Sequence, residues 1–435
     1  MDIDSVHFSI NIYYIGMFKR TIELFIEQYL NDKSHKILFI WGPRRSGKTT
    51  LLEKIAGKWG VPIFNFDLLT DQERFVPRRE VLQKLVSEHK IILIDEVQNY
   101  PESTIALKVL HDEFNVKIIA TGSSELRQKS NNFDSLSDRF ITAFKNTPRF
   151  NRGDELNADM SSSFGRGDHG LKPVEDVIEQ YCLPLSIYEI EDNTKTLGYE
   201  KDDFVKQLQS TLQKFGAYPE IYANKDLSEE DKIEKLQKIF DTYILKDVIN
   251  IYDLKNEQLA KNILTQIALQ LGSEVSIREI AANLGANKIT VAKYIEIFIK
   301  NYILISLPSF KTNARKAVSE HRKLYFYDLG IRNILVRDFR DLPLRPDKGG
   351  VFENFIISEF EKQRKIHTIH KTMYFYREYG GQEVDLILED YKKQYQALEI
   401  KIGEKKASKD VFPIPHSLVT VNTQNYFEKI KEEVK

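Results

Sequence analysis

One segment near the N-terminus constrains the fold of this chain more than any other. Residues 37–59, ILFIWGPRRSGKTTLLEKIAGKW, run from a short apolar strand through a glycine-containing loop into a helix with apolar residues at helical spacing. The loop matches the pattern G-x-x-x-x-G-K-[ST] at every defined position and in the strand, loop and helix context that the pattern requires. Strands that alternate with helices in this way predict a parallel α/β sheet.

The loop has the chemistry of a phosphate-binding site. Its glycines let backbone N–H groups surround phosphate oxygens, and the positive end of the following helix adds to the attraction. Lys48 is expected to reach the outer phosphates of a nucleotide, and the Thr49 hydroxyl to coordinate Mg2+. We therefore predict ATP and Mg2+ as cofactors, with a nucleotide-binding set made of Gly42, Pro43, Arg44, Arg45, Ser46, Gly47, Lys48, Thr49 and Thr50.

Two further apolar strands end in residues that suit the rest of such a site. In HKIILIDEVQNYP, the apolar run 91–94 is typical of a parallel strand covered on both faces. Asp95 is predicted to hold Mg2+ directly or through water, and Glu96 to polarise the attacking water. The strand in VKIIATGSSEL ends in small hydroxyl residues, of which Ser123 is predicted to orient water beside the γ-phosphate. A plain strand-to-loop turn is the alternative for Ser123, because Ser and Gly are common turn residues.

These segments resemble a known family. GPRRSGKTTLL, LIDEVQ and ATGSS, followed by LSDRF and LPLSIYEI, are similar to the AAA-type ATPase module of many archaeal and bacterial proteins. The resemblance implies a P-loop NTPase with a doubly wound parallel sheet. The family usually has Gly-Arg where this chain has Asp138-Arg139, so Arg139 is either a finger or sensor for transition-state charge or a surface arginine.

A helical region follows the ATPase module. Residues 145–176 are polar and rich in Gly, Ser, Asp and Arg, which predicts a flexible insertion in that module. Helical periodicity then predicts a connector, in which SIREIAANLGANKITVAKYIEIFIKNYILISL indicates a winged-helix-like unit with Ser276 capping its first helix. Its second helix exposes polar residues that suit either DNA contact or a packing module, namely Asn287, Lys288, Thr290 and Lys293. The basic run 311–323 is a better candidate for phosphate contact, although solvated charged loops are common.

The C-terminal segment 375–401, FYREYGGQEVDLILEDYKKQYQALEIK, predicts two antiparallel strands around a turn. Strand alternation places Glu383 and Asp385 on one face of the first strand, and Glu399 and Lys401 on one face of the second. The two pairs meet across the ladder if their faces agree. Glu353 is expected in the first turn of an amphipathic helix upstream, VFENFIISEFEKQ.

A helix acid, a strand Asp and Glu-x-Lys on the next strand resemble the PD-(D/E)XK, or restriction-endonuclease-like, nucleases. The resemblance implies that Glu353, Asp385 and Glu399 hold Mg2+ or Mn2+, and that Lys401 orients or activates the water that attacks a phosphodiester. GGQEVDLIL and ALEIK are also similar to the C-terminal domain of unknown function that accompanies this ATPase in its family. A degenerate nuclease fold used for binding or assembly is the alternative. The predicted catalytic residues are Lys48, Glu96, Ser123 and Arg139 in the first site and Asp385, Glu399 and Lys401 in the second.

Length and composition set the organisation. A chain of 435 residues is longer than a single hydrophobic core usually organises, so we expect several domains. We predict an AAA-type ATPase domain at 1–200, a helical connector at 201–325 and a small α/β nuclease-like domain at 326–435. The net charge of -1 offers no global basic field, so DNA contact must rest on local patches. A single cysteine, Cys182, excludes an intrachain disulfide and fits a reducing compartment. Acidic residues near the start and the lack of an apolar run of roughly 18 residues predict a cytoplasmic protein without a membrane partner.

The leading hypothesis is an ATP-hydrolysing AAA-type protein whose nucleotide state controls a nuclease-like, DNA-directed domain. The alternative is a nucleotide-dependent switch or scaffold whose nuclease-like domain is catalytically inactive. A small-molecule kinase would share the phosphate loop, but Asp95 and Glu96 suit water activation better. DNA as a partner and assembly into a homo-oligomer are left open by the sequence.

Overall fold

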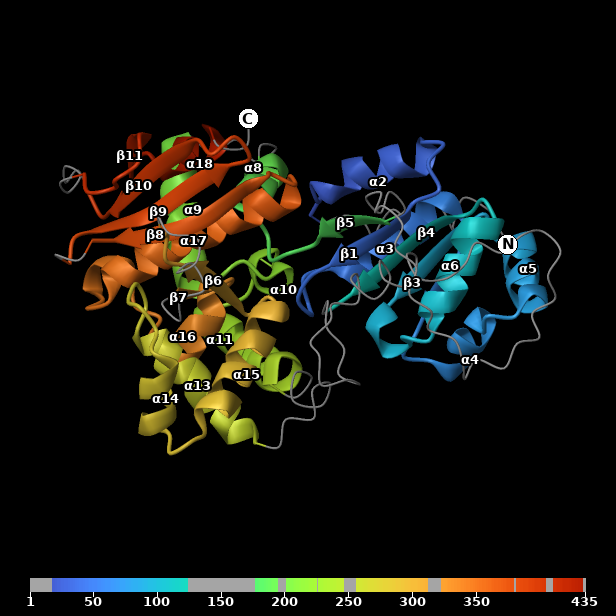
Figure 1. Ribbon diagram of the computed structural model, residues 1–435, viewed down its shortest axis with the longest axis horizontal. Helices are drawn as coiled ribbons and strands as arrows, with labels where there is room; N and C mark the ends of the chain where they lie inside the picture. The colour runs from blue at the N-terminus through green and yellow to red at the C-terminus, as the bar shows by residue number, and fades with distance from the viewer. Residues whose placement is uncertain are drawn as a thin grey trace. The chain divides into compact units, whose positions relative to one another are not determined.

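The computed structural model describes residues 18–123, 177–194, 201–224, 226–245, 256–311, 322–378, 381–403 and 410–432 (Figure 1). Arg139, the insertion 145–176 and most of the basic run 311–323 lie outside these ranges. The chain divides into two compact units, one made of Leu30–Ile40 and Leu52–Glu179, the other of Met1–Tyr29, Trp41–Leu51 and Gln180–Lys435. The division into three domains at 200 and 325 stays a prediction.

The N-terminal part is built on a five-stranded parallel sheet, as the alternation of strands and helices predicted. Its strands follow the order β2-β3-β4-β1-β5. β3 pairs in parallel with both β2 and β4, and every residue of β1 and β4 is buried, which explains their continuous apolar runs. The bounds are Ile37–Trp41 for β1, Ile63–Asn65 for β2, Ile91–Asp95 for β3, Lys117–Gly122 for β4 and Val177–Tyr181 for β5.

One helix precedes these strands and others connect them. They form because apolar residues recur at helical spacing; in α5, for example, Leu82, Leu85 and Val86 are the buried residues. The helices are α2 (Ile22–Asn31), α3 (Lys48–Trp59), α4 (Leu69–Gln72), α5 (Arg79–Glu88) and α6 (Ser103–Glu113), with short 3-10 turns η1 (Glu73–Phe75) and η2 (Val97–Asn99).

The middle of the chain is helical, as predicted. It contains α8 (Ile187–Thr194), α9 (Lys201–Phe215), α10 (Pro219–Tyr222), α11 (Glu229–Ile239), the π-helical turn η4 (Phe240–Leu245), α13 (Glu257–Leu269), α14 (Ile277–Asn283) and α15 (Lys288–Lys300). The Ser276 hydroxyl accepts a hydrogen bond from Glu279 N at 3.2 Å, so the predicted cap of α14 is confirmed. Asn287 caps α15 in the same way, accepting from Ile289 N at 2.8 Å.

A small antiparallel sheet follows these helices. It consists of β6 (Leu304–Pro308) and β7 (Arg322–Phe326). Three helices followed by two antiparallel strands agree in order with a winged-helix unit, and that assignment stays a prediction. Asn287 and Lys288 are exposed at the start of α15, whereas Thr290 and Lys293 are half-buried.

The C-terminal sheet has the strand order β11-β10-β9-β8 and is packed against α17, which runs along one of its faces (Figure 1). β9 and β10 are antiparallel, with Leu386 opposite Leu398, so the predicted hairpin is confirmed. The stretch 375–401 covers more than two strands, however, because its first residues belong to β8. The bounds are α16 (Leu329–Val336), η6 (Leu342–Leu344), α17 (Lys348–Ile366), β8 (Lys371–Arg377), β9 (Glu383–Asp390), β10 (Tyr395–Lys401), β11 (His416–Asn422) and α18 (Tyr426–Glu432).

Helix α17 differs from the prediction in two respects. It begins at Lys348, so Glu353 lies in its second turn rather than its first. It is also buried on most sides rather than amphipathic, because strands β7 and β10 and helices α9, α16 and α18 pack against it. Its buried charges are paired: Glu359 with Lys362 at 2.6 Å, and Glu361 with Arg364 at 2.7 Å.

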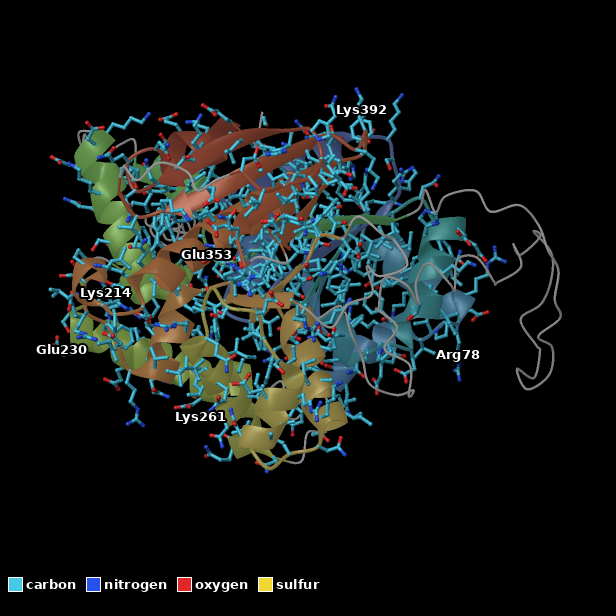
Figure 2. The ribbon with its side chains drawn as sticks, turned by 60° about the vertical axis from the view of Figure 1, so that its left-hand side comes forward. Arg78, Lys214, Glu230, Lys261, Glu353 and Lys392 are labelled. Carbon is cyan, nitrogen blue, oxygen red and sulfur yellow. The ribbon has the colours of Figure 1, made fainter. Side chains whose placement is uncertain are left out.

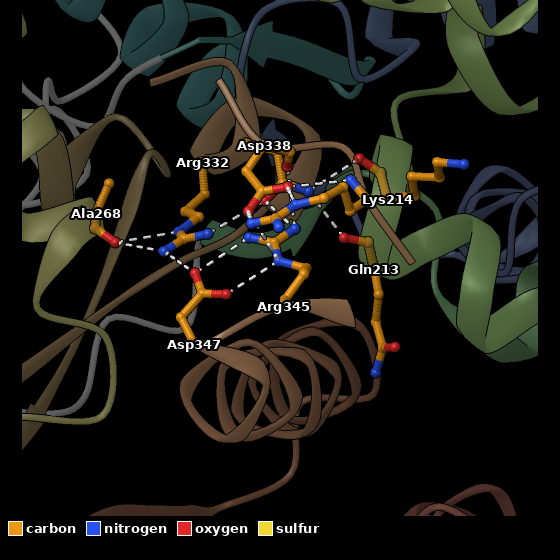
Figure 3. A network of polar contacts seen from close by, with 9 residues as sticks. Gln213, Lys214, Ala268, Arg332, Asp338, Arg345 and Asp347 are labelled. Carbon is orange, nitrogen blue, oxygen red and sulfur yellow. Dashed lines mark hydrogen bonds and ion pairs between the residues drawn. The ribbon is translucent and has the colours of Figure 1, made fainter. Parts of the chain in front are cut away.

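A network of buried arginines fixes the loop between α16 and α17 (Figure 3). Arg332 donates to Ala268 O at 2.8 and 3.1 Å and pairs with Asp347 at 2.5 Å. Arg345 makes a bidentate pair with the same carboxylate, at 3.0 and 3.1 Å, and donates to Asn333 Oδ1 at 3.0 Å. Because Asp347 directly precedes α17, the network fixes the residue at which that helix begins and therefore the position of Glu353.

Candidate functional site

The phosphate loop lies between β1 and α3 and has two residues in the left-handed region, Arg45 with φ 65° and Gly47 with φ 98°. Lys48 is 4% exposed, and its Nζ donates to Gly42 O at 2.8 Å and to Pro43 O at 2.9 Å. The Ser46 hydroxyl donates to Pro43 O at 2.8 Å. These contacts curl the loop backbone, which is the form that presents N–H groups to an anion.

Packing also requires glycine at position 42, which the sequence motif alone does not reveal. A Cβ at this position would lie 1.9 Å from Cys182 O, in the segment that follows β5. Cys182 N donates to Trp41 O at 2.7 Å, which brings the two backbones together. The other predicted nucleotide-binding residues are placed along the same loop: Pro43 and Ser46 are buried, Arg44 and Gly47 are half-buried, and Arg45, Thr49 and Thr50 are exposed.

The acids after β3 form a second group with β4. Asp95 is buried, and its Oδ1 accepts hydrogen bonds from the Thr121 hydroxyl and, at 3.1 Å, from Glu96 N. Glu96 adopts a left-handed conformation with φ 54°, which is uncommon for a residue other than glycine and is frequent at functional sites. Asp95 is therefore held in one orientation, while Glu96 is turned away from the direction of the strand.

Gln98 was missed by the sequence analysis although it ends the segment LIDEVQ. Its Nε2 donates to the Glu96 carboxylate and, at 3.1 Å, to Ser123 Oγ, and its Oε1 accepts from Ser123 N at 3.3 Å. Gln98 thus brings together Glu96 and Ser123, the two residues predicted to act on the water. The only sequence signal was its place two residues after Glu96.

The predicted residues of the C-terminal site also meet. Lys401 Nζ lies 2.8 Å from Glu399 Oε2 and 3.9 Å from Asp385 Oδ2. The Asp385 carboxylate accepts from Ile400 N at 2.7 Å, which holds it against β10. The faces of β9 and β10 therefore agree, as the alternation required. Glu353, which lies among densely packed side chains (Figure 2), reaches this group from α17.

Three carboxylates lie close enough to hold one metal ion. Oxygens of Glu353, Glu383 and Asp385 are all within 4.8 Å of one another, which suits a hard cation such as Mg2+ or Mn2+. Glu383 replaces Glu399 in this trio. Glu399 is 2% exposed and faces Lys401, so its assignment as a metal ligand stays a prediction.

A buried lysine, Lys323 from β7, enters the same cluster; the sequence analysis placed it at the end of the basic run 311–323 as a candidate for phosphate contact, which its burial and its acidic partners contradict. Lys323 is 1% exposed and its Nζ contacts Glu353 Oε1 at 3.0 Å and the Glu383 carboxylate. Tyr325 OH donates to Glu353 Oε1 at 2.5 Å, and Arg377 pairs with Glu383 from the other side. The segment KLYFYDLG carried the signal, because strand alternation puts Lys323 and Tyr325 on one face.

The charges of the cluster shift its titration. Burial, and then the charge of Glu353, raise the pKa of Asp385 to about 7, although Ile400 N–H, Lys401 and Lys323 oppose the shift. Burial lowers the pKa of Lys323, but Glu353 and Glu383 raise it by more, so the net shift is upward. Burial lowers the pKa of Lys401, but Glu399, Asp385 and Glu353 together raise it by more, so the net shift is upward. Both lysines are therefore cations at neutral pH, and Asp385 exchanges a proton there.

Sequence families match three consecutive parts of the chain. Residues 34–148 match the family described as AAA domain, so this part is an AAA-type domain with a P-loop. Residues 207–342 match a domain of unknown function (DUF8612), and residues 348–418 match another domain of unknown function (DUF4143). The carboxylate cluster combines residues from both of these regions, because Lys323 and Tyr325 lie in the first and the acids in the second.

Two relatives match most of the chain. The uncharacterized protein MJ1637 of Methanocaldococcus jannaschii is 24% identical over 330 residues, which cover 71% of this chain and 64% of that protein. An uncharacterized protein of Haemophilus influenzae is 23% identical over 333 residues, covering 71% of this chain and 72% of that protein. The chain thus spans somewhat less than two thirds of the first relative.

Solved structures of Thermotoga maritima RuvB are similar at a low level. A RuvB mutant is 15% identical with a TM-score of 0.27, covering 66% of this chain and 88% of that chain. The structure described as the RuvB Holliday junction branch migration motor is 14% identical with a TM-score of 0.25, covering 65% and 86%. Scores this low carry no argument about function. Among the described residues, no helix has the length and apolar character needed to cross a membrane.

Proposed function

We propose that the chain binds and hydrolyses ATP with Mg2+, and that its nucleotide state controls a metal-dependent, DNA-directed domain at the C-terminal end. The observation that carries the ATP half is the complete phosphate loop at 42–49, which opens α3 and lies within the AAA-domain match. The acids after β3 lie within the same match. Together these features support a nucleoside triphosphate with Mg2+ as the ligand.

In this proposal, loop N–H groups and Lys48 hold the outer phosphates, and Thr49 and Asp95 hold Mg2+. Glu96 polarises the attacking water and Ser123 orients it. Their shared contact with Gln98 supports this pairing of roles, because it fixes one side chain relative to the other. Arg139 supplies positive charge to the transition state, either in its own chain or to a neighbouring copy in a homo-oligomer.

The C-terminal half of the proposal is phosphodiester hydrolysis. Carboxylates of Glu353, Glu383 and Asp385 would hold Mg2+ or Mn2+, which supplies charge stabilisation at the phosphate. Because its pKa is raised, Lys401 acts as a cation that orients water or phosphate rather than as a base. Without the cation the pKa of Asp385 is raised to about 7, so binding of the metal ion would displace a proton from this carboxyl and would be weaker at low pH.

One observation favours a second candidate, a nucleotide-dependent switch whose C-terminal domain cuts nothing. The buried ammonium of Lys323 already pairs with two of the three carboxylates that would hold the metal. An ammonium in that place stabilises the fold without a divalent cation and competes with one.

The ATP half is tested by phosphate release from the Lys48→Ala variant, with Lys58→Ala on the exposed face of α3 as the matched control. We expect hydrolysis to be lost in the first and retained in the second; hydrolysis at the normal rate in Lys48→Ala would refute the assignment.

The proposed nuclease activity of the C-terminal domain is tested by nicking of plasmid DNA with Mn2+. Nicking that is lost in Asp385→Asn and Glu399→Gln supports the nuclease, and no nicking by the wild type favours the switch.

A further inference from the structure

A buried arginine, Arg20, touches the phosphate loop but belongs to none of the motifs described above. It precedes α2, is 6% exposed and donates three hydrogen bonds from its guanidinium. Nη1 donates to Ser46 O at 2.6 Å, Nη2 to Leu183 O at 2.6 Å and Nε to Glu189 Oε1 at 2.8 Å. Ser46 lies in the middle of the phosphate loop, so Arg20 holds the backbone that is proposed to wrap around phosphate.

The partners of Arg20 are themselves fixed. Glu189 Oε1 also accepts from Thr21 N at 3.0 Å, and its Oε2 accepts from Ser186 N at 3.1 Å. Arg20 and Glu189 form an ion pair in which both side chains are buried, an arrangement that is tolerated only when the hydrogen bonds of both charges are satisfied. These hydrogen bonds hold the Arg20 guanidinium in one position. It therefore connects the Ser46 carbonyl, the Leu183 carbonyl and the Glu189 carboxylate.

The segment 183–187 makes a second set of contacts, with α17. Glu359 Oε2 accepts from Ile187 N at 3.0 Å, and Lys362 Nζ donates to Leu185 O at 3.1 Å. Glu359 and Lys362 are buried and also pair with each other. Glu353 of the carboxylate cluster lies six residues earlier on the same helix, which at 1.5 Å per residue is about 9 Å along the axis.

We propose that Arg20 is a positioning residue of the nucleotide site, and that its contacts transmit the state of the phosphate loop through residues 183–189 to α17. A shift of the Ser46 carbonyl on phosphate binding moves Arg20, and with it Leu183 and Glu189. The backbone groups of Leu185 and Ile187 are hydrogen-bonded to Lys362 and Glu359. A movement of this segment therefore displaces α17 as a rigid element. This inference rests on the proposed ATP binding and adds the residues that carry its effect to the C-terminal cluster.

The first test measures the dissociation constant of Mg-ATP and the turnover rate in Arg20→Gln and Arg20→Lys. Glutamine cannot span three acceptors, and lysine keeps the charge but loses the planar fork. We expect about tenfold weaker ATP binding for Arg20→Gln and about threefold for Arg20→Lys, a graded loss of the size expected for charge-assisted hydrogen bonds. Arg78→Gln, an exposed arginine at the surface (Figure 2), is the matched control and should bind ATP normally. Folded Arg20 variants that both bind and turn over ATP like the wild type would overturn the inference.

The second test uses amide hydrogen exchange with and without saturating Mg-ATP. In the wild type, ATP should slow exchange in the phosphate loop, at Ile187 and in α17 near Glu359. In Glu359→Gln, which keeps the shape of the side chain but loses its charge, the slowing in α17 should fall by at least half while that in the loop persists. Lys362→Met repeats the test from the other side of the contact should Glu359→Gln fail to fold.

The outcomes separate the two levels of the proposal. A wild-type protein that does not bind ATP refutes the proposed function, and this inference with it. ATP binding that slows exchange in the phosphate loop but leaves α17 unchanged refutes the inference alone and leaves the ATPase assignment intact.

Discussion

The carboxylates of the C-terminal cluster repel one another, and other groups in the cluster compensate this repulsion. Three acids lie within reach of one cation, and Lys323 lies between two of them as an internal counter-charge. Bringing like charges together in a buried place is costly unless a cation or a proton compensates. The chain supplies both, with Lys323 as the cation and Asp385 as the group that retains a proton near neutral pH.

The Lys323→Met substitution tests this balance. It keeps the length of the side chain but leaves Glu353 and Glu383 without their buried partner, so we expect a loss of about 3–5 kcal/mol in the free energy of unfolding. Mn2+ should restore more stability to this variant than to the wild type, because it replaces the missing charge. Chemical denaturation with and without Mn2+ measures both effects. Lys392→Met, at an exposed position (Figure 2), is the control, and an Mn2+ effect equal in all three proteins would contradict the argument.

Asp385 should make stability depend on pH in a defined direction. Its folded pKa of about 7 exceeds the unfolded value of 3.8, so the folded state binds the extra proton between these values. The contribution is therefore present at low pH and is lost as the pH rises through 7. Between pH 5 and 7 the wild type should lose about 2–3 kcal/mol more than Asp385→Asn, since each pH unit is worth about 1.4 kcal/mol for one proton. Denaturation curves at pH 5, 6, 7 and 8 measure the difference, and parallel curves for the two proteins would refute it.

At the scale of elements, sequence periodicity predicted more than side-chain chemistry did. The phosphate loop, the two buried strands, the Ser276 cap and the β9–β10 hairpin followed from local pattern, because each is set by neighbours in the sequence. Lys323 could not be assigned in this way, since its partners lie 30 and 60 residues away. The predicted start of α17 was wrong by one turn because the arginine network at that point includes partners far apart in the sequence, such as Arg332 and Ala268, which are 64 residues apart.

That network predicts unequal effects for two arginines in similar pairs. Arg345 is buried and bidentate to Asp347, whereas Arg340 is exposed and bidentate to Asp338 at 3.0 and 2.8 Å. We expect Arg345→Lys to cost about 1–3 kcal/mol in the free energy of unfolding, because lysine cannot form the fork and so loses part of the buried contacts with Asp347 and Asn333. Arg340→Lys should change the free energy of unfolding far less, because exposed pairs contribute little. Urea denaturation of the two variants compares them directly, and equal losses would show that the network does not fix α17.

At the scale of the whole molecule, the proposed coupling runs from the phosphate loop through Arg20 and residues 183–189 to α17, which also carries Glu353. Glu353 in the second turn of α17 belongs to the carboxylate cluster. Further along the helix, Glu359 and Lys362 are hydrogen-bonded to the backbone of residues 183–187. A rigid helix gripped at two points transmits displacement better than a flexible linker does.

This arrangement predicts how ATP affects DNA nicking. In the wild type with Mn2+, a non-hydrolysable ATP analogue should change the nicking rate by at least about threefold, because coupling energies between sites are typically 1–3 kcal/mol. Lys48→Ala should nick at the nucleotide-free rate of the wild type whether or not the analogue is present, since its loop cannot hold the phosphates. Asp385→Asn should hydrolyse ATP yet nick nothing, which shows that the nucleotide site folds and works without the cluster. A wild-type nicking rate that ignores the analogue, in a protein that binds it, would mean that the two sites share a chain but not a mechanism.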